Sequence, residues 1–266
     1  MKTSRIKSIV IVILLLVNAF LLVLLLGRQN QQRIAYERSV EQLSLLLTNN
    51  GIAFDTSLLP DNASYPAAEL SHDADAEAAF ARALLGDNAA ARSTASGSSV
   101  YESERGSLQF RTNGTIEGSM NCHVGDPAEF LSGILSSSGY LIDVSNVNTD
   151  GSGTAVAVRE VDGIKVFNAP LMFTFEDNVL TSVSDSFLPS VTLVAPAGGT
   201  DAISALVRFL DHRNSNGLVC TEITSLTYGY LLQSSAASAK FVPAWHIATD
   251  VSEYYVNSVT GEITRE

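Results

Sequence analysis

The strongest constraint on this chain is an apolar run from Ile9 to Leu26 that only Asn18 interrupts. At about 1.5 Å of rise per residue, a helix of this length just crosses a hydrocarbon core of about 30 Å. A secretory signal has a shorter apolar region, of about 7 to 15 residues, followed by a small-x-small cleavage site. No Ala-x-Ala pattern follows Leu26. The run therefore predicts an uncleaved transmembrane helix over residues 9–26, and a cleaved signal peptide is the less favoured alternative.

The charges that flank this run predict its orientation. Lys2, Arg5 and Lys7 precede it, and no acidic residue lies among them. Because short loops rich in Lys and Arg stay in the cytoplasm, we expect residues 1–8 to form a cytoplasmic tail. The part of the chain beyond the span is then extracytoplasmic, and the protein crosses the cell membrane once.

Asn18 marks one face of the predicted span. An amide near the middle of a bilayer costs free energy unless it finds a hydrogen-bond partner. We expect the face that contains it to meet another transmembrane helix, although a bond from Asn18 to its own backbone stays open. By helical spacing, this partner-binding face consists of Ile11, Leu14, Leu15, Asn18, Leu21, Leu22 and Leu25.

Charge and cysteine content exclude several classes of partner. The formal net charge is -12, and the first 27 residues contain no acid, so the negative balance lies beyond the span. Such a polarity argues against nucleic acid and against an anionic membrane surface as partners. Cys122 and Cys220 form no C-x-x-C motif, and we expect them to remain unpaired.

The segment after the span reads as a helical stalk over residues 27–50. Its apolar residues Tyr36, Val40, Leu43 and Leu47 follow helical spacing, and they face either the chain's own domain or a partner's helix. Residues 51–105 form an N-terminal extracytoplasmic segment. It contains an Ala-rich helix at about 73–85 and then a candidate linker at 86–99, rich in Ala, Ser, Asn and Gly.

Two α+β units are predicted beyond residue 105, at 106–188 and 189–266. Asn113-Gly114 lies between two alternating runs, which is a strong hairpin signal. In each unit a short amphipathic helix precedes strand-like runs, so we expect a helix on one face of an antiparallel sheet, twice. The predicted helices are 126–138 and 201–212, and the predicted strands are 140–147, 154–161, 165–175, 218–230, 239–249 and 253–257.

Motifs that would indicate catalysis or cofactor binding are absent from the sequence. None of His72, His123, His212 and His246 stands at a spacing typical of a metal site. No G-x-S-x-G, G-x-x-x-x-G-K-[ST] or G-x-G-x-x-G occurs. We therefore predict a protein that is not an enzyme, with no catalytic, cofactor or metal site. A catalytic carboxylate pair hidden among the many acids stays open.

Several segments in the second half of this chain are specific enough to compare with known families. The most specific are Val242-Pro243-Ala244-Trp245 and a Tyr-Val-Asn-x-x-Thr-Gly-Glu-Ile run that ends at Ile263. The others are Phe167–Phe173, Asp201–Leu206 and Thr227–Tyr230. Together they resemble the YycH/YycI family, especially its YycI-like members, and the first two also resemble PepSY-like domains. The resemblance covers the anchor and roughly residues 106–266, and it implies one membrane helix that carries an extracytoplasmic α+β domain.

The resemblance also implies a function. Family members regulate the sensor kinase of the WalK/WalR (YycG/YycF) two-component system, which controls cell-wall metabolism in Gram-positive bacteria. We therefore expect a membrane-anchored regulator whose partners are a WalK-like sensor histidine kinase and a YycH-like protein. The alternatives are an extracytoplasmic cell-wall enzyme, and a PepSY-type protease inhibitor or chaperone, which would need an exposed strand edge.

Overall fold

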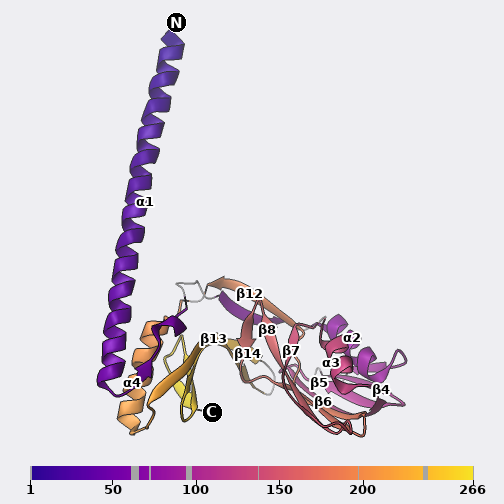
Figure 1. Cartoon of the computed structure of the whole chain (residues 1–266). Helices are drawn as coiled ribbons and strands as arrows, with labels where there is room; N and C mark the ends of the chain where they lie inside the picture. Colours follow the sequence, from indigo (N-terminus) through magenta and orange to yellow (C-terminus); the bar gives the residue numbers. More distant parts are fainter. Residues whose placement is uncertain are drawn as a thin grey trace.

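The computed structural model is a mixed α+β structure in which a long sheet is accompanied by four α-helices in the described part (Figure 1). It describes residues 2–60, 66–71, 73–93, 98–136, 138–196, 198–235 and 239–265.

The helices are α1 (Lys2–Asn49), the 3-10 turn η1 (Thr56–Leu58), α2 (Ala74–Leu85), α3 (Pro127–Leu135) and α4 (Ala202–Asn216). The strands of the first half are β1 (Ala53–Phe54), β2 (Pro66–Ser71), β3 (Ala90–Ser93), β4 (Ser99–Ser103), β5 (Gly106–Phe110), β6 (Thr115–His123) and β7 (Tyr140–Val147). Those of the second half are β8 (Gly153–Val161), β9 (Ile164–Val166), β10 (Leu171–Glu176), β11 (Val179–Ser186), β12 (Ser190–Pro196), β13 (Glu222–Ser234), β14 (Ala239–Thr249), β15 (Glu253–Asn257) and β16 (Ile263–Arg265).

One continuous sheet runs through the body of the molecule. Among the described residues it has fourteen strands, in the order β16-β15-β14-β13-β9-β8-β10-β11-β6-β5-β4-β3, with β1 paired to β13 and β7 paired to β8. The short strand β9 joins its two halves, because it pairs antiparallel with β8 and parallel with β13. The two predicted units therefore share one sheet.

The first unit consists of the β3–β8, β10 and β11 part of the sheet with helices α2 and α3. Figure 1 shows both helices within the curve of this part. Its core contains Phe80 and Leu84 from α2, Leu131 from α3, and Phe173 and Phe175 from β10. Helix α2 lies in the predicted 51–105 segment, so that segment contributes directly to the first core.

The second unit consists of α4, β1, β13–β16 and the end of α1. Trp245 of β14 is fully buried and lies with Phe209 of α4 in one core. Leu43 and Leu47 of α1 are buried in the same core. The apolar stripe of the stalk thus packs on the chain's own domain, while the rest of α1 projects away from it (Figure 1).

A two-stranded ribbon, β2 with β12, covers the junction of the two units. Ala68 of β2 shares a third core with Val166 of β9, Leu188, and Tyr230 of β13. The hydroxyl of Tyr230 donates a hydrogen bond to the carbonyl oxygen of Pro66 at 2.7 Å. The alanine-rich sequence of β2 gave no alternating signal, and this strand was not predicted.

Short polar signals in the sequence fix where helices and hairpins begin and end. The carboxylates of Asp73, Asp126 and Asp201 accept backbone N–H groups at the N-termini of α2, α3 and α4. The predicted hairpin at Asn113-Gly114 joins β5 to β6, with Gly114 at φ 81°. This left-handed conformation is the one that a three-residue hairpin loop with a glycine bulge requires.

Two predicted segments differ from the structure. The candidate linker at 86–99 contains strand β3, which pairs with β4 at the end of the sheet. The single strand predicted at 165–175 is two strands, β9 and β10, separated by residues 167–170. Pro170 has no N–H to donate, and the Asn168 side chain both donates to and accepts from the backbone of Leu232. This break moves the chain from one half of the sheet to the other.

The predicted membrane helix lies within α1, which continues without interruption through the predicted stalk. Most side chains of residues 9–26 are outside the described set, including those of Ile11, Leu14, Leu15 and Leu25. Of the described face, Asn18, Leu21 and Leu22 are exposed. Among the residues that the structure describes, no helix is found that is long and apolar enough to cross a membrane.

The two cysteines are free, as predicted, and both are buried. Cys122 belongs to the core of the first unit, and Cys220 belongs to that of the second. Burial also raises the pKa of the Cys220 thiol.

Candidate functional site

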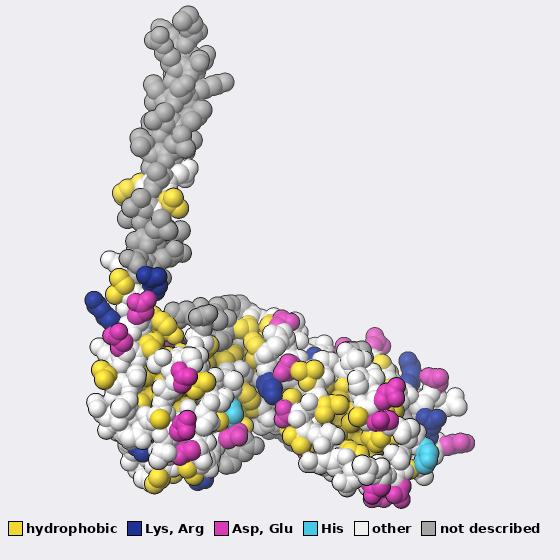
Figure 2. Space-filling view, in the orientation of Figure 1, with side chains coloured by type: hydrophobic (Ala, Val, Ile, Leu, Met, Phe, Trp, Pro, Cys, Tyr) yellow, Lys and Arg dark blue, Asp and Glu magenta, His cyan; other side chains and the backbone are white. Residues whose placement is uncertain are grey.

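A groove of about 520 Å³ lies where the two units adjoin, and we call it the junction groove. Figure 2 shows the face of the molecule at which the two units meet. Its size is within the range of small-molecule sites in proteins. Its walls are formed by Asp143, Val158, Glu160, Gly163, Lys165, Val166, Phe167, Ser225, Thr227, Tyr228, His246, Glu253 and Tyr255.

Strand register brings the polar residues of the second unit together. Thr227 of β13 pairs with His246 of β14, which pairs with Tyr255 of β15. Directly paired residues of adjacent strands point to the same side of a sheet. Trp245, the neighbour of His246, points to the opposite side and into the core beneath α4. The helix thus covers one face of this half of the sheet, and the other face forms a wall of the groove.

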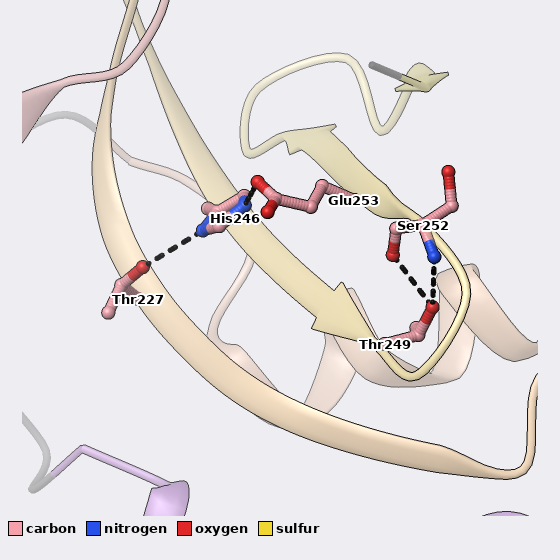
Figure 3. Close-up of polar contacts among 5 residues, drawn as sticks. All are labelled: Thr227, His246, Thr249, Ser252 and Glu253. Carbon is pink, nitrogen blue, oxygen red and sulfur yellow. Dashed lines mark hydrogen bonds and ion pairs between the residues drawn. The ribbon is translucent and has the colours of Figure 1, made fainter. Parts of the chain in front are cut away.

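His246 is the best-connected polar side chain of the groove (Figure 3). Its Nε2 atom lies 2.7 Å from Oε2 of Glu253, and its Nδ1 atom lies 3.4 Å from the hydroxyl of Thr227. Its side chain is 16% exposed, so it lies partly out of water.

Aromatic rings surround the imidazole of His246. The ring of Tyr255 stacks on it, with centroids 5.0 Å apart, and the ring of Phe167 lies at 5.2 Å. Phe167 reaches this place because Gly229 lies below its ring, where a Cβ atom would collide with it. The glycine is therefore needed for the close approach of the chain after β9 to β13.

Charged groups line the other wall of the groove. Lys165 of β9 donates to the carboxylate of Asp143 in β7 at 3.1 Å, and both side chains are nearly half exposed. Glu160 and Glu253 add two more carboxylates. With Lys165 as the one permanent cation in the described lining, the groove has a negative balance that favours cationic or hydrogen-bonding ligands.

The acid, imidazole and hydroxyl of Glu253, His246 and Thr227 have the order of a hydrolase triad, but the geometry is less suitable. A base and a nucleophile are expected at about 2.6 to 3.2 Å, which is shorter than the contact between Thr227 and His246. Thr227 also lies within a regular strand instead of at the sharp turn that exposes a nucleophile. The arrangement is better suited to binding than to acyl transfer.

The Val-Pro-Ala-Trp segment and the run that ends at Ile263 stabilise the end of the β14–β15 hairpin and the turn before β16. The hydroxyl and N–H of Ser258 donate to the carbonyl oxygen of Pro243, which lies just outside the β14–β15 pairing. The Asn257 side chain accepts the backbone N–H groups of Val259 and Thr260 in the turn before β16, and Gly261 has φ 75°. The described residues contain no group of His, Cys, Asp and Glu side chains that could hold a metal ion.

Comparisons with known proteins give little further information. No family model and no curated protein matches the chain, so the resemblance to the YycH/YycI family stays a prediction. Among solved structures, the chain is similar to the C-terminal domain of YpeB from Bacillus megaterium, with 11% sequence identity and a TM-score of 0.38. The similarity covers 74% of this chain and 98% of that chain.

Proposed function

We propose that this chain is a membrane-anchored, non-enzymatic regulatory protein. Its extracytoplasmic domain binds and modulates a sensor histidine kinase that controls cell-wall metabolism. The observation that supports this most directly is the seating of the helix end in the second unit. Leu43 and Leu47 are 2% and 0% exposed in the core that also contains Trp245.

A rigid connection of this kind suits a regulator. The N–H of Ile52 bonds back to the carbonyl oxygen of Leu47, and Arg213 of α4 donates to that of Asn50 at 3.2 Å. Helix α1 therefore joins the domain without a flexible linker. A change in the position of the second unit would be transmitted as a tilt or rotation of α1. A helix in the membrane could pass that movement to a partner's helices.

Cross-linking in native membranes, followed by mass spectrometry, tests this proposal. We expect a sensor histidine kinase among the cross-linked partners, together with a YycH-like protein. The double variant Leu43→Asp with Leu47→Asp places two charges in the core and should detach α1 from the second unit. Compared with the unmodified chain, this variant should still cross-link to the kinase through residues 2–26, but it should no longer change the activity of the kinase. Recovery of cell-wall enzymes alone would contradict the proposal.

A second candidate function is supported by a separate observation. The PepSY-type inhibitor or chaperone alternative needs an exposed strand edge. Among the described residues β7 pairs with β8 alone, and residues 141–146 of β7 are exposed. In that case the partner would be a secreted enzyme, and the same cross-linking experiment would recover it in place of the kinase.

A further inference from the structure

In the described part of the sheet, four strands pair with one other strand only, namely β1, β3, β7 and β16, and they differ in length. Strand β1 has two residues. The end strands β3 and β16 have four and three residues, so each offers few unpaired backbone groups. Short edge strands are one way in which proteins avoid unwanted pairing. Strand β7 has eight residues, and among the described residues it pairs with β8 alone. Its other side is the longest open edge.

The side chains of β7 are unusual for an open edge. Leu141, Ile142 and Val144 are 53%, 39% and 45% exposed. The strand contains no proline and no lysine, the residues that commonly protect an edge. Figure 2 shows hydrophobic side chains at the surface in the region where Figure 1 labels β7.

The ends of β7 are held in place, so the edge is already formed. Tyr140 is buried, and its hydroxyl donates to the carbonyl oxygen of Ser186 and accepts the N–H of Leu188. At the other end, Val147 packs against the core of the first unit. A preformed edge binds an extended segment without the entropic cost of ordering itself.

We propose that β7 is a docking edge for an extended segment of another protein, one that adds a strand and carries both basic and apolar side chains. Main-chain hydrogen bonds would give such a strand its affinity, and contacts with Leu141, Ile142 and Val144 would give it specificity. The proposal stands apart from the identity of the kinase, because any partner could supply the strand.

The charges around β7 decide the kind of occupant. The acidic residues of β7 and the turn to β8 are Asp143, which pairs with Lys165 at 3.1 Å, and Asp150. No Lys or Arg lies within residues 140–152, and the whole chain has a formal net charge of -12. A second copy would bring the same carboxylates together. A basic strand would instead neutralise these acids.

Fluorescence anisotropy with a labelled eight-residue peptide, in which valine alternates with lysine, tests the proposal on the full chain in detergent. We expect saturable binding and slower hydrogen exchange of the β7 amides. A peptide with glutamate in place of lysine should bind at least tenfold more weakly. A lysine peptide whose backbone nitrogens are methylated should not bind, because it cannot donate main-chain hydrogen bonds to β7. Absence of β7 protection would overturn the proposal.

Matched double variants locate the site. Leu141→Lys with Val144→Lys places cations on the edge, so lysine-peptide binding should fall at least tenfold. Val219→Lys with Val251→Lys adds the same charge at positions that are 72% and 60% exposed and lie away from β7. This control should bind as the unmodified chain does. An equal loss in both variants would overturn the proposal. A dimer in sedimentation that only the β7 variant abolishes would also overturn it, in favour of a second copy.

Discussion

Trp245 combines two stabilising roles at a single residue. Its ring is fully buried beneath α4, and its indole N–H donates to the carbonyl oxygen of Thr200 at 2.8 Å. Trp245→Ala should cost about 3 to 5 kcal/mol in the free energy of unfolding, because it leaves a large cavity. Trp245→Phe should cost less, since it mainly leaves the Thr200 carbonyl unpaired, at about 1 to 3 kcal/mol. Chemical denaturation measures both, and Val259→Ala at an exposed position is the control. Equal costs for Trp245→Ala and Val259→Ala would refute the core assignment.

The carboxylate of Asp250 should make the free energy of unfolding depend on pH. Its carboxylate accepts hydrogen bonds from the side chain and the backbone N–H of Thr221, and these bonds lower the pKa of Asp250 below the ordinary 3.8. A carboxylate with a lowered folded pKa stabilises the fold above its unfolded pKa, and this contribution is lost as pH falls through the folded value. Asp250→Ala should therefore be less stable than the unmodified chain at pH 7. The difference should narrow as the pH falls below 3.8 and through the lower folded value. Thermal unfolding across this range measures it, and a gap independent of pH would contradict the assignment.

At the scale of elements, local patterns in the sequence were sufficient for many helices and strands. Strands β7, β14 and β15 lie at the predicted residues, because apolar alternation and flanking turn residues define them. The α+β class is confirmed. The break at Asn168 and Pro170 was missed, since the apolar run on either side looked continuous. The junction groove was not predictable in this way, because Asp143, Phe167 and His246 meet through strand pairing between distant segments, which local pattern does not encode.

Helix α1 yields a prediction that rests on the proposed membrane anchor. If the face marked by Asn18 meets a partner's membrane helix, Asn18→Leu should weaken association with the kinase while leaving insertion intact. Asn18→Gln should largely preserve it. Interhelical hydrogen bonds in membranes average about 0.6 kcal/mol, so the expected loss is roughly threefold. Co-purification from membranes measures it. Unchanged recovery with Asn18→Leu would mean that the helix serves only as an anchor.

At the scale of the whole molecule, the joint between the two units depends on a narrow set of contacts. Strand β9 pairs with β13 at two positions, Lys165 with Gly229 and Val166 with Tyr230. The N–H of Phe167 adds a bond to the carbonyl oxygen of Tyr230 at 2.9 Å. The β2–β12 ribbon covers this joint through Ala68 and its neighbours. The relative position of the units is therefore sensitive to any change that separates β9 from β13.

Gly229→Ala is the smallest change that tests this joint. A Cβ atom there would collide with the ring of Phe167 and with the carbonyl oxygen of Lys165. The backbone oxygen cannot move without displacing β9, so we expect the joint to open while each core stays folded. Small-angle scattering should then show a larger radius of gyration, and limited proteolysis should cut more rapidly within residues 162–170. The matched control is Gly133→Ala in α3, where the added atom meets open space and alanine favours the helix by about 1 kcal/mol. The control should leave both measurements unchanged. If Gly229→Ala also leaves them unchanged, β9 does not set the position of the units, and other contacts across the joint hold them, such as the β2–β12 ribbon and the bonds between Asn168 and Leu232.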